Sequence, residues 1–179
     1  KDIIYFHSLF WPIMLKTAGW KTPNEIFAHG MLTVDGVKLS KSKGSFINAR
    51  TYLKHLPPDY LRYYFACKCS DTIADIDLNL DDFTSRVNSD LIGKITNIAS
   101  RSFQMLQKSL DGKLGSLPTD GKKLIKSAQS KSEIIAKQYE QRQFAKAMIE
   151  IRGIADEANK YFDQYTPWKL IKEDSEKTR

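Results

Sequence analysis

A cluster of lysines and serines between residues 38 and 44 is the part of this chain best suited to chemistry. The run reads Lys-Leu-Ser-Lys-Ser-Lys-Gly, and no carboxylate lies between Asp35 and Asp59. Lysines can follow phosphate oxygens as charge moves, serine hydroxyls add short hydrogen bonds, and glycine lets the backbone approach a ligand. These residue types point to a polyanionic substrate, although a solvated basic surface loop has the same composition.

The order of these residues is more specific than their composition. Residues 38–42 resemble the KMSKS signature of class I aminoacyl-tRNA synthetases, with Leu39 in the second, hydrophobic place. In that family the loop closes over ATP and stabilises the pyrophosphate leaving group. The resemblance implies that Lys38 and Lys41 contact the phosphates, and that Ser40 and Ser42 shape the loop.

The segments on either side of this loop are expected to position it. Residues 1–17 are apolar on most faces and predict a buried helix, which Pro12 would kink or divide. Residues 26–34 are expected to form a strand, which the turn at Asp35-Gly36 ends just before the loop. Two short helices are expected after the loop, over residues 49–55 and 60–67.

A long helical pattern begins at about residue 80, after an acidic connector over residues 71–79. An apolar stripe predicts a first helix of about 30 residues. Further helices are expected over residues 122–139, 143–164 and 168–172. The sequence therefore predicts a mainly α fold with two domains. With the resemblance, residues 1–79 are the C-terminal remnant of a Rossmann-type α/β catalytic domain, and residues 80–179 are an antiparallel helical anticodon-binding bundle.

Further motifs narrow the resemblance to the methionyl-tRNA synthetase family. The opening Lys1 to Pro12 is similar to the stretch that enters the active site before the KMSKS loop in that family. The similarity continues to Pro167-Trp168 and covers nearly the whole chain. The other matching motifs are Asp59-Tyr60-Leu61-Arg62-Tyr63-Tyr64, Asp77-Leu78-Asn79-Leu80 and Arg86-Val87-Asn88.

The resemblance also implies which residues contact the small substrates. A histidine of the opening helix lines the methionine pocket in the family, so Ile3 and His7 are expected there. An apolar and aromatic wall suits a thioether, although the residues alone favour a packed core histidine. Glycine within a strand marks the close approach of a ligand or of another backbone. The residues implied for ATP are Asp2, His29, Gly30, Leu32, Lys38 and Lys41.

A polar stripe on the long helix is the candidate RNA site. The spacing of Lys94, Asn97, Arg101 and Lys108 places them on one helical face. Asparagine and arginine can hydrogen-bond unpaired base edges, and lysine can hold phosphate. A solvated helix face has the same spacing.

The family resemblance gives this stripe a role in reading the anticodon. It implies that Asn97 and Arg101 contact anticodon bases and that Trp168, which follows Pro167, stacks on one of them. Asp163 lies near the family's corresponding acidic position. Trp168 as a cap on the core is the alternative.

Composition bounds the remaining possibilities. The net charge of +7 favours a polyanionic partner without naming one. Cys67 and Cys69 are too few and too close for a zinc site or a disulfide framework, so free thiols are expected. No apolar run approaches the ~20 residues that span a membrane, and the opening residues lack a signal-peptide layout. We expect a cytoplasmic location, and part of a longer protein because no starting methionine is present.

Taken with the resemblance, these observations predict methionine activation by ATP and transfer to tRNA(Met), including the initiator tRNA. Mg²⁺ is expected to arrive with ATP, and any zinc site to lie outside this chain. The sequence has no HIGH-type motif, so the 179 residues alone are expected to be inactive. Two alternatives remain: a non-catalytic tRNA-binding module, and a class I synthetase for leucine, valine, isoleucine or cysteine.

Overall fold

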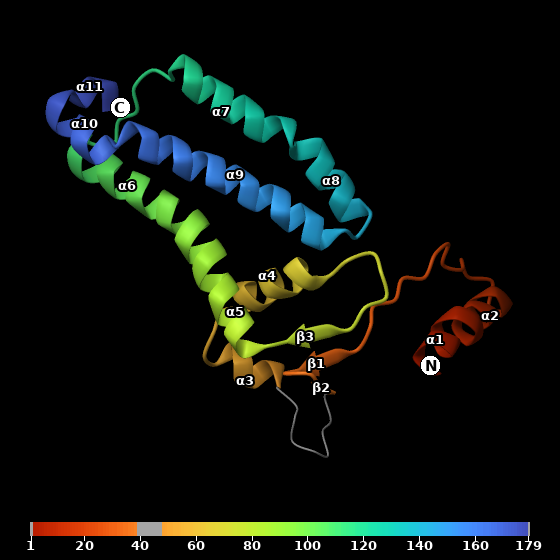
Figure 1. Ribbon diagram of the computed structural model, residues 1–179. Helices are drawn as coiled ribbons and strands as arrows, with labels where there is room; N and C mark the ends of the chain where they lie inside the picture. The colour runs from red at the N-terminus through yellow and green to blue at the C-terminus, as the bar shows by residue number, and fades with distance from the viewer. Residues whose placement is uncertain (1, 39–47, 179) are drawn as a thin grey trace.

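The computed structural model describes residues 2–38 and 48–178, which form a mainly helical chain with one small sheet (Figure 1). Long helices make up one side of the molecule, and the sheet with two short helices makes up the other. The opening helix stands beyond the sheet. The prediction of a mainly α fold is confirmed.

The opening helix consists of three consecutive segments, α1 (Asp2–Tyr5), the π-helix η1 (Phe6–Phe10) and α2 (Trp11–Thr17). The Trp11 N–H donates to the Phe6 carbonyl, five residues back, just before Pro12, which has no N–H to donate. Pro12 therefore coincides with the predicted division. The prediction that this helix is buried is wrong, because none of its residues is buried and its segments pack chiefly against one another.

Three short strands form a sheet in the order β2-β1-β3 among the described residues. β1 (Leu32–Val34) pairs antiparallel with β2 (Val37–Lys38) and parallel with β3 (Ile76–Leu78). The predicted strand over residues 26–34 is thus only three residues long, and His29-Gly30 precede it. The connector over residues 71–79 contains β3, a strand that was not predicted because the segment is acidic.

The turn predicted at Asp35-Gly36 is confirmed, and it joins β1 to β2. Both residues have positive φ, 49° for Asp35 and 73° for Gly36. Two consecutive positive φ angles are typical of the tight turns that match the twist of a hairpin. The hairpin directs the chain into the basic loop that begins at Lys38.

Gly30 allows the backbone just before β1 to approach the backbone just before β3. Its N–H donates to the Ala74 carbonyl at 3.0 Å, and a Cβ on Gly30 would lie 2.3 Å from that oxygen. Only glycine permits this approach. The close neighbour expected at this glycine is therefore a second backbone segment.

Helices α3 (Ala49–Leu53) and α4 (Pro58–Lys68) lie between β1 and β3 along the chain, and both were predicted within two or three residues. Parallel strands need such a crossover connection. The arrangement is the βαβ unit expected of a remnant of a Rossmann-type domain.

The predicted long helix is present over residues 80–109. It consists of α5 (Leu80–Arg86), the π-helix η2 (Val87–Thr96) and α6 (Asn97–Ser109). Asn79 begins it, because its side-chain oxygen accepts from the Asp82 N–H at 2.8 Å. In η2, a Cβ on Gly93 would lie 3.1 Å from the Asn88 carbonyl, five residues back. A glycine therefore relieves crowding in the wider turn.

The remaining helices are α7 (Thr119–Ser130), α8 (Ser132–Glu140), α9 (Phe144–Tyr165), α10 (Pro167–Glu173) and α11 (Ser175–Thr178). The single helix predicted over residues 122–139 is two helices, divided at Lys131. Helices α9 and α10 match the predictions closely. The chain doubles back between α8 and α9, so the long helices run antiparallel (Figure 1).

Two clusters of buried side chains hold these elements together. Tyr64 is fully buried and packs with Leu78 of β3 and Phe83 and Val87 of the long helix. Its neighbour Tyr63 packs on the other cluster, whose buried residues Ala147 and Met148 belong to α9. Helix α4 thus contributes to both clusters and joins the sheet to the helical bundle.

Candidate functional site

Arg101 on α6 is the centre of an aromatic and acidic cluster. Its guanidinium carbon lies 4.7 Å from the Phe162 ring centroid and 5.3 Å from that of Trp168. Its Nη2 atom lies 3.5 Å from Asp163 Oδ1, and the Phe162 and Trp168 rings are 6.0 Å apart. The predicted residues Arg101, Asp163 and Trp168 are therefore brought together, and Phe162 joins them.

The chain reverses direction after α9, and this reversal places Trp168 in the cluster. Thr166 has a left-handed backbone (φ 41°), and Pro167 begins α10 and is buried. Just before the reversal, the Tyr165 hydroxyl donates a short hydrogen bond to Asp120 of α7. That bond raises the pKa of Tyr165 to about 12. The tight turn and this bond fix the end of α9, and hence the direction in which Trp168 leaves it.

An open pocket of about 520 Å³ adjoins the cluster. Trp168 stays 40% exposed beside it, which leaves part of its ring available for stacking. Asn97 is exposed one turn before Arg101 and does not line the pocket. The lining residues are Arg101, Gln104, Met105, Lys108, Ser109, Phe162, Trp168 and Ile171.

Sequence reasoning missed part of this pocket. Neither Phe162, an apolar residue of α9, nor Gln104 is among the residues predicted for this site. The only signal for Phe162 was its position beside Asp163. Lys94 does not extend the open site, because its ammonium group is paired with Asp156 at 2.8 Å across to α9.

The residues predicted to contact methionine lie on the exposed opening helix. His7 Nδ1 donates to the Ile3 carbonyl at 2.8 Å, one turn earlier in the same helix, and Asp2 begins α1. Ile3 is 71% exposed. None of these three residues lines the pocket beside the aromatic cluster.

Four of the residues predicted to contact the nucleotide, namely His29, Gly30, Leu32 and Lys38, lie in the hairpin or just before it. His29 Nδ1 donates to the Gly30 carbonyl at 2.7 Å. Leu32 begins β1 and packs against the cluster around Tyr64. Lys38 ends β2, opposite Thr33. The predicted loop residues Ser40, Lys41 and Ser42 lie outside the described residues.

Asp77 and Asn79 anchor the hairpin from which the basic loop leaves. Asp77 accepts from the Thr33 hydroxyl at 2.5 Å and from the Gly36 N–H at 2.8 Å, and these bonds lower the pKa of its carboxyl. The Asn79 amide donates to Asp35 at 2.8 Å. The sequence marked both residues only as part of a matching motif, because their partners lie more than forty positions away.

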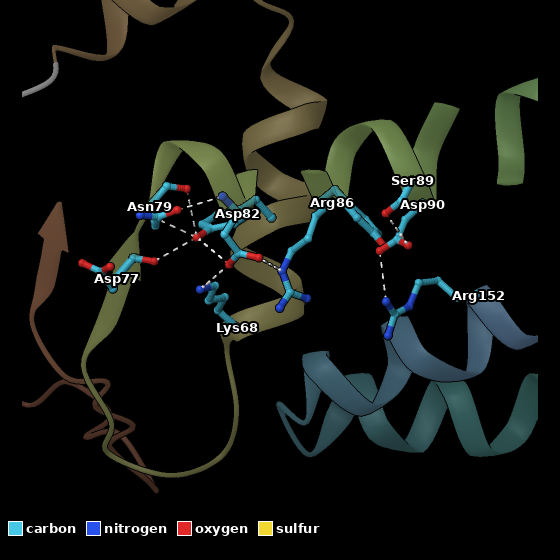
Figure 2. A network of polar contacts seen from close by, with 10 residues as sticks. Lys68, Asp77, Asn79, Asp82, Arg86, Ser89, Asp90 and Arg152 are labelled. Atoms are coloured by element: carbon cyan, nitrogen blue, oxygen red, sulfur yellow. Dashed lines mark hydrogen bonds and ion pairs between the residues drawn. The ribbon is translucent and has the colours of Figure 1, made fainter. Parts of the chain in front are cut away.

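Figure 2 shows a second polar network, between α4 and the start of the long helix. Asp82 pairs with Lys68 at 2.7 Å and with Arg86 at 2.8 Å, and it accepts from the Tyr64 hydroxyl at 3.1 Å. The bond from Lys68, helped by Arg86, lowers the pKa of Asp82 to about 2. Three donors from two helices thus converge on one carboxylate.

Asp90 forms a buried junction between three helices (Figure 2). It is 4% exposed and accepts from Tyr63 of α4 at 2.7 Å and from Arg152 of α9 at 3.0 Å. Burial disfavours its charged form, but the two donors outweigh that cost and keep the pKa of Asp90 below its usual range. The junction fixes α9 against α4 and η2.

Two properties of the described residues concern metal binding and membrane insertion. No three His, Cys, Asp or Glu side chains in residues 2–38 and 48–178 are grouped so as to hold a metal ion. None of the helices in these ranges is long and apolar enough to cross a bilayer. Cys67 and Cys69 are free and half-buried.

Comparison with known proteins agrees with this geometry. The sequence model of class I tRNA synthetases (M) matches residues 1–103, and the model of the anticodon-binding domain of methionyl-tRNA ligase matches residues 112–179. The chain is 59% identical to the methionine–tRNA ligase of Bdellovibrio bacteriovorus over all of its own length and 26% of that protein. It therefore spans about a quarter of that relative's length.

Solved structures give the same family. The chain is 31% identical to Mycobacterium tuberculosis methionyl-tRNA synthetase bound by methionyl-adenylate, with a TM-score of 0.83 over 99% of this chain and 35% of that one. The ligand-free structure of that enzyme gives a TM-score of 0.78 at 29% identity, over 99% of this chain and 34% of that one. With more than half of its residues matched by the family's own sequence model, this chain belongs to the methionyl-tRNA synthetase family of class I tRNA synthetases.

Proposed function

We propose that this chain is the part of a cytoplasmic methionine–tRNA ligase that closes over ATP at one end and reads the tRNA anticodon at the other. Residues 1–79 supply the nucleotide side and residues 80–179 the anticodon side. The observation that carries the proposal is the Arg101 cluster, in which a guanidinium group and a half-exposed indole face an open pocket.

The reaction begins with activation of methionine. A carboxylate oxygen of methionine attacks the α-phosphorus of ATP, the bond from that phosphorus to the bridging oxygen breaks, and pyrophosphate leaves. The chain's contribution is electrostatic: Lys38 and Lys41 stabilise the charge that develops on the phosphates, while Ser40 and Ser42 shape the loop. ATP arrives as its Mg²⁺ complex. A ribose hydroxyl at the 3′ end of tRNA(Met), including the initiator, then attacks the carbonyl carbon of the adenylate, the ester bond forms, and AMP leaves.

The remaining nucleotide-side residues bind and orient the two small substrates. We assign Ile3 and His7 to the methionine side chain, whose thioether an apolar wall suits. The hydrogen bond of His7 to the Ile3 carbonyl holds the imidazole against its own helix. The residues assigned to the nucleotide besides the loop lysines are Asp2, His29, Gly30 and Leu32.

The Arg101 cluster suits an unpaired base better than a duplex. An aromatic ring, a guanidinium plane and nearby amides can stack on a splayed base and bond its edges. Asn97 and Arg101 would contact the base edges, and Trp168 would stack, with Pro167 and Asp163 fixing the positions of the tryptophan and the arginine. Lys108, which lines the pocket, is suited to a phosphate.

The loop chemistry predicts a specific effect of Lys41→Ala in the intact enzyme. The rate of methionyl-adenylate formation should fall by at least about 100-fold, as when a preorganised charge is removed from a transition state. The dissociation constant of ATP should change far less. Rapid-quench measurement of adenylate formation, beside equilibrium ATP binding, gives both quantities.

The matched control is Lys16→Ala, which removes a lysine near the end of α2 that the proposal gives no role. Equal losses in ATP binding and in rate for Lys41→Ala would contradict a role in the transition state. A panel of amino acids in the same assay separates methionine from leucine, valine, isoleucine and cysteine. Preferred activation of any of the others would overturn the substrate assignment.

A further inference from the structure

The turn between α8 and α9 touches the sheet side of the molecule, at the end of α9 opposite the Arg101 cluster. Arg142 in this turn has a left-handed backbone (φ 60°), and the Gln143 N–H donates to the Gln138 carbonyl at 2.8 Å. The turn lies beside the segment that leads into β1 and the loop that leads into β3 (Figure 1). Two of its side chains, those of Arg142 and Gln143, contact these segments.

Arg142 covers the ring of Phe27. Its guanidinium carbon is 3.2 Å from the ring centroid, a stacked cation–π arrangement. Phe27 remains 55% exposed with the arginine in place, so the contact lies at the surface of the molecule. Phe27 lies two residues before His29 and three before Gly30, which the proposed function places at the nucleotide.

Two further hydrogen bonds attach the same turn to the loop before β3. The Gln143 side-chain amide donates to Asp71 Oδ2 at 2.9 Å. The Ala145 N–H, in the first turn of α9, donates to the Cys69 carbonyl at 2.9 Å. The loop in turn accepts the Gly30 N–H at Ala74. The turn thus holds both of the segments that converge on Gly30.

The other contacts of α9 make it a rigid connection between the two ends of the molecule. The helix has 22 residues and so spans about 33 Å. Arg152 near its middle reaches Asp90, and Asp163 near its C-terminal end reaches Arg101. One helix therefore touches the nucleotide-side segment at its start and the anticodon cluster at its end.

We propose that Arg142, stacked on Phe27, is a positioning residue that sets the direction of α9 relative to the nucleotide side, and so places the acceptor end of a bound tRNA at the adenylate. The inference rests on the proposed function. The contacts described for Arg142 are with Phe27 and the Glu140 carbonyl, and with none of the residues assigned to ATP, methionine or the anticodon. Arg142 therefore affects neither adenylate formation nor anticodon affinity. It affects the transfer step, which depends on both ends at once.

The test is Arg142→Ala in the intact enzyme, where alanine keeps the same backbone strain and removes only the side chain. We expect kcat for tRNA aminoacylation to fall about tenfold, since displacements near 1 Å can cost up to about 100-fold. ATP–pyrophosphate exchange and the dissociation constant for tRNA should stay within about twofold of wild type. Arg142→Lys, which keeps a cation over the ring, should restore most of the rate.

Two further variants identify the contact responsible. Phe27→Leu keeps an apolar side chain without the ring face, so it should lower kcat alone, and the pair with Arg142→Ala should be no worse than either single variant. Lys137→Ala on α8 is the matched control, because it removes a positive charge from the same hairpin for which the structure describes no contact with the sheet side. It should leave kcat unchanged.

An unchanged kcat for Arg142→Ala would overturn the inference. Parallel losses in ATP–pyrophosphate exchange would also overturn it, because the residue would then support the fold of the nucleotide side. Failure of the proposed function looks different. In that case the wild-type enzyme itself would not exchange ATP with methionine or charge tRNA(Met).

Discussion

The side chains of the candidate site are held in position by residues that are distant in sequence. Arg101 is held by Phe162, Asp163 and Trp168 from two other helices. The ion pair is 3.5 Å long and its members are about half exposed, so it contributes little to stability. Its effect is on conformation: the guanidinium plane is already beside the pocket before a base arrives, which reduces the entropic cost of binding.

Asp82 allows a test at this scale through pH. Its pKa is lowered from 3.8 to about 2 by Lys68 and Arg86. As pH falls, the unfolded state binds the proton first, so the stabilisation is complete above about pH 4 and is lost between pH 4 and 2. We expect Asp82→Asn to cost about 1 kcal/mol of unfolding free energy near neutral pH, after allowance for solvent screening, and almost nothing at pH 2.

Denaturant unfolding of wild type and variant across this pH range measures that difference. Asp81→Asn is the control, since the structure describes no ion pair for the neighbouring carboxyl. A difference between wild type and Asp82→Asn that did not shrink below pH 4 would contradict the assigned ion pairs.

Residues of a characteristic type within a family motif were easier to predict from the sequence than the residues that hold them in place. The family resemblance singled out Arg101 and Trp168, which the structure brings together beside the pocket, whereas Asn97, singled out in the same way, does not line it. Phe162 was not found, because a phenylalanine on an apolar stripe has the same signature whether it packs in the core or lies under an arginine. Asp77 and Asp90 were missed because the sequence does not give the partners of a carboxylate.

The elements that position the basic loop depend on one close approach of two backbones. Gly30 and Ala74 are hydrogen-bonded, and the Ile76 N–H donates to the Met31 carbonyl at 2.9 Å, where the β1–β3 pairing begins. A side chain at residue 30 would push the two segments apart. The hairpin at Asp35-Gly36, which Asp77 anchors, would then lose its register with β3.

Gly30→Ala should therefore loosen the sheet, at a cost of about 1–3 kcal/mol for an overpacked site. Hydrogen exchange is the measurement, with faster exchange expected at the Ile76 and Asp35 amides. Gly153→Ala is the matched control on α9, where the added Cβ would meet only Lys131 Nζ at 3.5 Å. It should be neutral or stabilising by up to about 1 kcal/mol. Unchanged protection of Ile76 in Gly30→Ala would contradict the tight approach.

Helices with an apolar stripe over many turns were predicted correctly from the sequence. The prediction failed for elements whose structure or burial depends on contacts with distant parts of the chain. The long helix from residue 80 and α9 were predicted because their apolar stripes persist over many turns. β3 was missed because Asp75 and Asp77 gave an acidic appearance, although Ile76 and Leu78 point into the core. The opening helix was expected to be buried because of its apolar faces, but in the described residues its segments pack chiefly against one another.

The sheet unit and the helical bundle, to which the proposed function assigns the nucleotide and the anticodon, are joined through α4 and α9. Tyr63 and Tyr64 of α4 pack into different clusters, and Asp90 joins α4, η2 and α9 with buried hydrogen bonds. Such a joint resists bending because its contacts are buried and oriented. Under the proposed function, a joint movement of these two helices would couple the anticodon cluster to the nucleotide side.

Reading of the CAU anticodon by the Arg101 cluster is the central claim, and equilibrium binding of initiator tRNA to the intact enzyme tests it most directly. The wild-type enzyme should bind this tRNA more tightly than the same tRNA with an altered anticodon, across a salt series. Trp168→Ala should lower the affinity for the CAU tRNA about 5- to 150-fold, the worth of one stacked base, and abolish the preference. Equal, purely salt-driven binding of both tRNAs by wild type would contradict the account.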